Sequence, residues 1–205
     1  DALTSGACNI ALGINALGAA TDNCSNIAIG NNALAASVND ADFNVAIGCN
    51  AMGGADVSGL CNVALGTNAM DALTVGCSNV AIGGHALGVL TSGSFNVAIG
   101  ANSADALETG SRNIAIGLET LTNTTNGACN IAIGYAALKT SANDGHFNIG
   151  IGCYALGGGD LSGADNIAIG SNTADAMTTG SCNVALGINA LGTATIANRN
   201  VAMGE

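Results

Sequence analysis

Large aliphatic residues alternate with small or polar ones in a five-residue motif, Asn-(Ile/Val)-Ala-(Ile/Leu)-Gly, that occurs twelve times along the chain. Successive motifs start 17 or 18 residues apart. An alternation of period two predicts a short β-strand in each motif. The repeat is too short for a helical hairpin and fits one turn of a β-solenoid. The sequence therefore predicts an all-β fold, a parallel β-solenoid or β-roll of about twelve 17–18-residue turns, with 1–205 as one continuous domain.

The first and fifth motif positions are asparagine and glycine in every repeat. Asparagine amides stacked at ~4.8 Å can hydrogen-bond along the solenoid axis, so we expect a structural ladder, with a row of ligand-binding amides as the alternative. A glycine at each strand end predicts a turn with positive φ. The predicted ladder is Asn9, Asn26, Asn44, Asn62, Asn79, Asn96, Asn113, Asn130, Asn148, Asn166, Asn183 and Asn200. The predicted turn glycines are Gly13, Gly30, Gly48, Gly66, Gly83, Gly100, Gly117, Gly134, Gly152, Gly170, Gly187 and Gly204.

The second and fourth motif positions are large aliphatics, with Met203 in the last repeat, and the third is alanine except at Gly150. Neighbouring side chains of a strand point to opposite faces. We expect the large aliphatics to face the interior, which leaves an outward alanine strip against which another copy packs. The alternative is a narrow interior lined by alanine, with the aliphatics facing a partner. Either arrangement leaves an apolar strip that needs cover, and a parallel homotrimer fits best.

A second apolar pair, alanine followed by leucine or methionine, comes a few residues after most motifs. It predicts a second short strand that returns a large side chain to the same interior. Glycine, serine, threonine, asparagine and aspartate fill the remaining positions and predict turns. The pairs are Ala16-Leu17, Ala33-Leu34, Ala51-Met52, Ala69-Met70, Ala86-Leu87, Ala137-Leu138, Ala155-Leu156 and Ala190-Leu191.

A longer period overlies the short one. The motif spacings and the intervening sequences of 9–112 are repeated in 113–205, so the chain holds nearly two copies of a 104-residue, six-turn unit. Both ends of the sequence fall inside a repeat. This predicts a slice of a longer repetitive protein, or a subunit that stacks end to end.

The formal net charge is −11, and Arg112, Lys139 and Arg199 are the only lysines and arginines. Such a composition disfavours binding to nucleic acid and to anionic membrane surfaces. No apolar run approaches the ~18 residues that would span a bilayer, so no membrane insertion is expected.

The eight cysteines form no Cys-x-x-Cys pair, which argues against zinc or redox chemistry. Cys8 with Cys24, and Cys61 with Cys77, fall on neighbouring turns. At ~4.8 Å between turns, each pair lies within reach of a disulfide, and small half-buried thiols are the alternative. Oxidised pairs would imply an extracellular setting.

Catalytic patterns are missing from the sequence. His85 and His146 fall in different positions of the repeat, and three cations are too few for the charged groove of a solenoid lyase or hydrolase, so no enzyme is expected. Threonine forms no regular Thr-x-Thr row, which argues against ice binding. No cofactor is expected apart from loosely bound calcium, whose weak candidate ligands are Asp40, Asp42, Asp144, Asp160 and Asp165.

The stretch NIAIGLETLTNTTNGACNIAIGYAAL, from Asn113 to Leu138, resembles the repeats of phage and bacterial tail-fibre-like proteins. The same motif is similar to the head repeat of trimeric autotransporter adhesins, a left-handed β-roll in which three chains associate. The resemblance covers essentially the whole chain. It implies a left-handed solenoid, a homotrimer, an extracellular, cell-surface or virion-surface location, and contact with surfaces or glycans. It carries no catalytic residue.

These observations favour a structural segment of an extracellular fibre or filament that acts as a rigid spacer and display surface. The alternative is a receptor- or glycan-binding adhesin segment of a tail fibre or cell-surface appendage, in which the variable turns hold the binding site.

Overall fold

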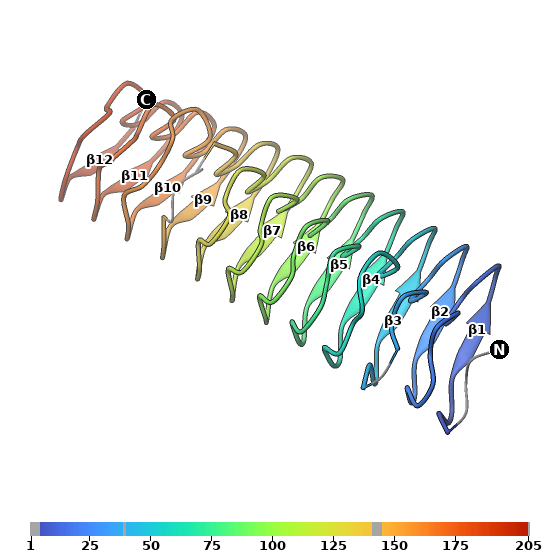
Figure 1. Cartoon of the computed structure of the whole chain (residues 1–205). Coiled ribbons are helices and arrows are strands. Elements are labelled where there is room, and N and C mark those ends of the chain that lie inside the picture. Colours follow the sequence, from blue (N-terminus) through green and yellow to red (C-terminus); the bar gives the residue numbers. More distant parts are fainter. Residues whose placement is uncertain (1–4, 39, 141–144, 205) are drawn as a thin grey trace.

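The computed structural model describes residues 5–38, 40–140 and 145–204, and it is a rod of stacked coils with the two termini at opposite ends (Figure 1). Each coil contributes one three-residue strand to a single 12-stranded parallel sheet, in sequence order. The described residues contain no helix. This confirms the predicted all-β parallel solenoid. The strands are β1 (Ile10–Leu12), β2 (Ile27–Ile29), β3 (Val45–Ile47), β4 (Val63–Leu65), β5 (Val80–Ile82), β6 (Val97–Ile99), β7 (Ile114–Ile116), β8 (Ile131–Ile133), β9 (Ile149–Ile151), β10 (Ile167–Ile169), β11 (Val184–Leu186) and β12 (Val201–Met203).

Consecutive coils pair in register, so that like residues stack. In the first pair Ile10 lies beside Ile27 and Ala11 beside Ala28, and the other pairs repeat this alignment. The spacing of 17 or 18 residues is therefore the length of one coil. At ~4.8 Å per step, the twelve strands span roughly 53 Å.

The expectation that the large aliphatics fill the interior is wrong. In each strand from β2 to β11 the central alanine or glycine is buried and the two flanking aliphatics are half-buried or exposed. The reason is the thinness of the coil. At Gly150, a Cβ would lie 2.9 Å from the Ala155 carbonyl oxygen, because the turn of the same coil lies directly behind the strand. The space behind the strand is too small for a large side chain, so the alternative orientation is the observed one.

The second apolar pair is buried as predicted in the inner coils, with Ala16 and Leu191 of the end coils half-buried, but it forms no strand. Leu34, Met52 and Met70 are fully buried in turn segments, where their φ angles lie near +50°. Their backbone N–H groups still donate along the axis, as from Leu34 N to Ala51 O at 3.0 Å. A left-handed turn rather than a second strand therefore carries the large side chain inward.

A third interior row lies on the return segment of the coil, and the sequence reasoning missed it. Its fully buried members are Leu73, Leu90, Leu107 and Met177. Val57 and Leu161 are buried at the corresponding place in two of the longer coils. Interior leucines facing a wall of alanine make a narrow core that runs the length of the rod.

Each turn glycine has φ between +119° and +141°. In the eleven from Gly13 to Gly187, a Cβ would lie 2.2–2.7 Å from the carbonyl oxygen of the equivalent glycine in the next coil. Close stacking of the coils, as well as turn geometry, thus requires glycine. None of the described residues forms a helix that could span a membrane.

Candidate interaction surfaces

The ladder asparagines are buried from Asn26 to Asn183 and bond along the axis. Asn96 is typical: its Oδ1 accepts from Asn113 N at 2.9 Å and from Asn113 Nδ2 at 3.1 Å. Its own Nδ2 donates to Asn79 Oδ1 at 3.1 Å and to Gly110 O at 2.8 Å. Every hydrogen-bonding group of this amide is used inside the protein, so it cannot bind an external ligand.

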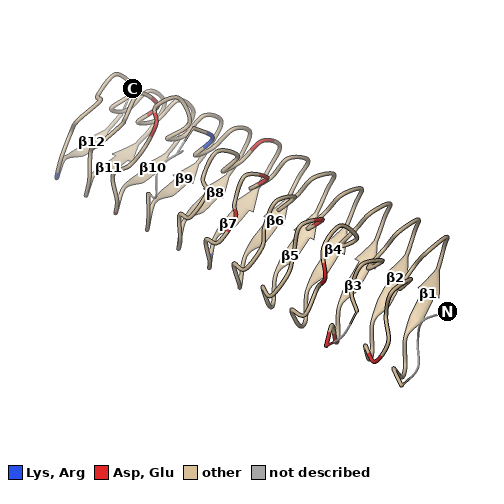
Figure 2. Ribbon diagram, viewed as in Figure 1, with Lys and Arg blue, Asp and Glu red and all other residues tan. Residues whose placement is uncertain are grey.

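The outward side of the sheet is an apolar strip, which we call the strand face. It carries two aliphatic side chains per coil and no charged residue in any coil. The charged residues that the structure describes lie on the connecting segments, and the strand arrows carry no charge colour (Figure 2). Its members are Ile10, Leu12, Ile27, Ile29, Val45, Ile47, Val63, Leu65, Val80, Ile82, Val97, Ile99, Ile114, Ile116, Ile131, Ile133, Ile149, Ile151, Ile167, Ile169, Val184, Leu186, Val201 and Met203.

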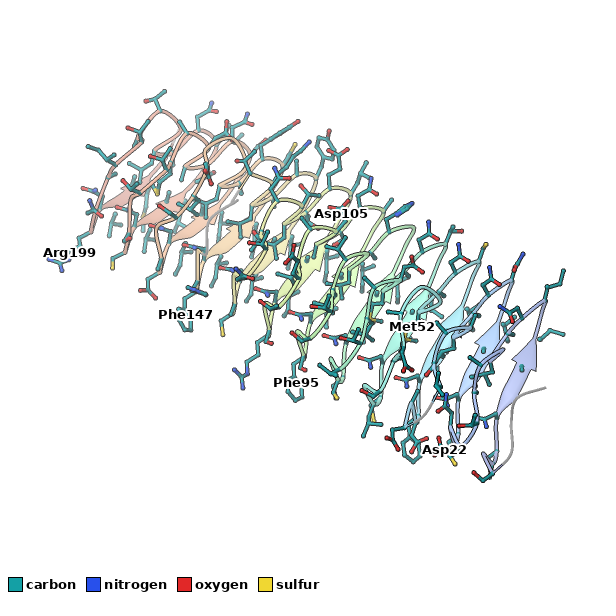
Figure 3. All side chains as sticks on the ribbon, in the orientation of Figure 1. Asp22, Met52, Phe95, Asp105, Phe147 and Arg199 are labelled. Carbon is teal, nitrogen blue, oxygen red and sulfur yellow. The ribbon has the colours of Figure 1, made fainter. Side chains whose placement is uncertain are left out.

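A second exposed row, which we call the ridge, consists of the residue immediately before each ladder asparagine. Phe95, Phe147 and Arg199 extend from this edge of the rod (Figure 3). All twelve ridge residues have φ between +57° and +62°, and ten of them are exposed. The ridge is, in coil order, Cys8, Ser25, Phe43, Cys61, Ser78, Phe95, Arg112, Cys129, Phe147, Asp165, Cys182 and Arg199.

The residue before each ridge residue often supplies a hydrogen-bond acceptor to the preceding coil. Cys24 N donates to Asp42 Oδ1 at 2.6 Å, and Ala128 N donates to His146 Nδ1 at 3.0 Å. Cys77 Sγ accepts from Leu60 N at 3.4 Å. Asp42, Cys77 and His146 thus have a structural role beside the ridge.

A polar groove follows another edge of the rod, beside a surface row of asparagines at the second residue after the turn glycine. Asn15, Asn32, Asn50 and Asn68 bond in sequence, each Nδ2 donating to the next Oδ1 at 3.1 Å. The row continues to His85, whose Nε2 lies 3.4 Å from Asn68 Nδ2. Small residues such as Gly53, Gly54 and Gly88 form the other wall.

Three aspartates line or adjoin this groove at equivalent places in their coils. Asp71 and Asp175, which are 104 residues apart, each have a buried Oδ1 without a hydrogen-bond partner. Burial raises the pKa of the Asp175 carboxyl, partly offset by the Gly158 N–H. Burial likewise raises the pKa of Asp105, with the nearby His85 opposing the shift. Two carboxyl groups of the groove, those of Asp105 and Asp175, therefore have a raised pKa.

The predicted calcium ligands and disulfides stay predictions. Among the described residues, no group of three or more histidine, cysteine or acidic side chains could hold a metal ion, and Asp40, Asp42, Asp160 and Asp165 stay candidate calcium ligands only. Asp144 lies outside the described residues. All eight cysteines are thiols in the structure, so the Cys8–Cys24 and Cys61–Cys77 bridges stay predictions.

The two histidines lie on different surfaces of the rod. His85 lies in the groove and His146 beside the ridge, on separate parts of the coil. Lys139 pairs with Glu119 at 2.6 Å, and this hydrogen bond raises the pKa of the lysine. No protein-family model, curated protein or solved structure matches this chain. The likeness to tail-fibre and adhesin repeats therefore rests on the motif alone.

Proposed function

We propose that this chain is a structural segment of an extracellular fibre, a rigid spacer whose copies self-associate through the strand face. The observation that carries the proposal is the uncharged aliphatic strip along a rod whose interior is already filled. At roughly 53 Å by three residues of ~3.3 Å, the strip covers roughly 500 Å². The largest apolar patch of a typical soluble monomer is itself about 300–600 Å² and is often functional. The extracellular location is part of the proposal and rests on the resemblance of the repeats.

Substitution at the centre of the strand face tests this proposal. Wild-type protein is expected to sediment as an oligomer, with a homotrimer as the expected size, in analytical ultracentrifugation. Ile99→Glu is expected to break the strand-face contact and lower the sedimentation coefficient, because a carboxylate at the centre of the contact would have to be desolvated without a partner. Val97→Thr combined with Ile99→Thr keeps β-propensity and is expected to weaken association less.

The matched control is Val89→Glu, since Val89 is an exposed aliphatic residue away from the strand face. It should leave the sedimentation of the protein unchanged. Circular dichroism shows whether each variant keeps its sheet. A wild-type protein that stays monomeric at high micromolar concentration would refute self-association through this face.

A glycan-binding adhesin segment is the second candidate, and the groove beside the surface asparagines favours it. Amide donors and acceptors repeat there at ~4.8 Å, and Tyr154 takes the place of an asparagine in a later coil, edge-to-face with Tyr135 at 5.4 Å. Polar groups that converge on a groove are typical of ligand sites. Asn50→Ala with Asn68→Ala is expected to abolish any glycan-array signal of the wild type. If the wild-type protein binds no glycan, the adhesin candidate fails and only the spacer function remains.

A further inference from the structure

The ridge has a symmetry that the fold does not require. Phe43 and Phe147 each lie 52 residues from Phe95. Cys61 and Cys129 each lie 34 residues from Phe95, and Cys8 and Cys182 each lie 87 residues from it. Counted in coils, phenylalanine and cysteine therefore recur in the same order in both directions from Phe95.

The phenylalanine rings are largely exposed, and the ring of Phe147 has one aromatic neighbour, His146, at 6.4 Å between centroids. Phe43, Phe95 and Phe147 are the only phenylalanines of the chain, and they are 59%, 58% and 58% exposed. A bulky side chain at φ near +60° is strained, and an exposed ring gains no burial in return. Since Ser25, Ser78 and the other ridge residues hold the same backbone conformation, the fold accepts a small polar residue here. The rings are therefore available to a partner.

We propose that the ridge is a docking surface for a second copy of this chain, laid antiparallel about a two-fold axis through Phe95. In a two-fold contact, if one residue of the first copy faces a second residue of the other copy, then the second residue of the first copy faces the first residue of the other. A two-fold axis through Phe95 places Phe43 of one copy opposite Phe147 of the second copy, and Cys61 of one copy opposite Cys129 of the second. Three aromatic contacts, spaced at about 14 Å by three coils of ~4.8 Å, then anchor the pair. Aromatic residues and arginine are the types enriched at protein interfaces.

The charges on the ridge select the antiparallel arrangement. In a parallel pair Arg112 would face Arg112, Asp165 would face Asp165, and Arg199 would face Arg199. In the antiparallel pair Arg112 faces Ser78, and Asp165 faces Ser25. Like charges placed opposite each other disfavour an interface, and the antiparallel register avoids all three contacts. This contact is separate from the strand face and does not depend on the proposed function.

Single-cysteine proteins and a short bis-maleimide test the arrangement. One protein keeps only Cys61 and the other only Cys129, with the remaining cysteines replaced by serine, a residue that already occurs on the ridge. Cross-linked dimers are expected when the two proteins are mixed, and not in either protein alone. The pairing of Cys8-only with Cys182-only protein should behave in the same way. Both cross-linking tests are repeated in proteins that also carry Ile99→Glu. Cross-linking that persists in these proteins comes from the ridge contact and not from the strand face.

Ridge substitutions give the strength of the contact. Phe95→Ser is expected to reduce the cross-linking rate of the mixture at least about tenfold, because it removes the central anchor. Val89→Ser, off the ridge, should not change the rate. Ser78→Asp is expected to increase the rate a few-fold, because the new carboxylate would face Arg112 of the second copy. Ser78→Arg should decrease it.

Two results would overturn the proposal. Cross-linking of Cys61-only protein with itself would mean a parallel pair. A mixture that stays uncross-linked, while circular dichroism shows intact sheet and free-thiol titration shows accessible cysteines, would mean that the ridges do not meet.

Discussion

Asn96→Ala is expected to lower the free energy of unfolding by about 3–5 kcal/mol, one of the two largest effects of a single substitution in this chain. The side chain of Asn96 is 1% exposed and joins three coils. Its removal leaves Asn113 N and Gly110 O without their partners, and it opens the ladder at Asn79. Each buried group left unpaired costs ~1–3 kcal/mol.

Urea denaturation followed by circular dichroism measures this effect. The control is Asn32→Ala on the surface row, which breaks two amide–amide bonds at 3.1 Å that water can replace. Since Ala136 holds the same left-handed turn position, with φ of 54°, this change should cost about 1 kcal/mol or less. Equal destabilisation by the two variants would show that burial of the ladder contributes little.

Gly100→Ala is expected to be comparably severe, at about 3–5 kcal/mol. Gly100 has φ of +136°, a conformation that side chains rarely adopt. The added Cβ would also lie 2.3 Å from Gly117 O and 2.6 Å from Gly117 C. Because these atoms belong to the backbone of the next coil, relief of the clash requires that the coils separate and their hydrogen bonds lengthen.

Gly84→Ala provides the matched control for this substitution. A Cβ at Gly84 would meet only Thr67 O at 3.9 Å, an ordinary contact. This variant should unfold within about 0.5 kcal/mol of the wild type, since loss of a glycine also restricts the unfolded chain. If Gly100→Ala melted at the wild-type temperature, the close approach of Gly100 to Gly117 would not exist in solution.

The period of the motif was sufficient to predict the stack. Because each coil has the same length and the same residues at the same places, parallel in-register pairing puts Ile10 beside Ile27 with no other information. The glycine at each strand end and the asparagine before each strand follow from that stacking. Their roles can be inferred from the sequence because each depends on its own copy in the next coil.

The inner and outer sides of the strand could not be read from the same pattern. An alternation of alanine with isoleucine defines two faces and does not say which is inside. Hydrophobicity favoured the larger residue for the interior. The short distance between strand and turn, as between Gly150 and Ala155, instead leaves room only for the smaller residue. The third interior row at Leu73 and Leu90 was missed because the return segment varies in length and composition.

The sequence by itself determined that this chain is a parallel stack of short coils, because a strict repeat forces each residue to meet its equivalent. Only the tertiary structure decided how wide each coil is. That width depends on left-handed turns at residues such as Leu34 and Met52. The conformational propensities of leucine and methionine do not predict these turns. Once the coil is narrow, alanine lines the interior, the aliphatics form an outer face, and the ridge residues project from its edge.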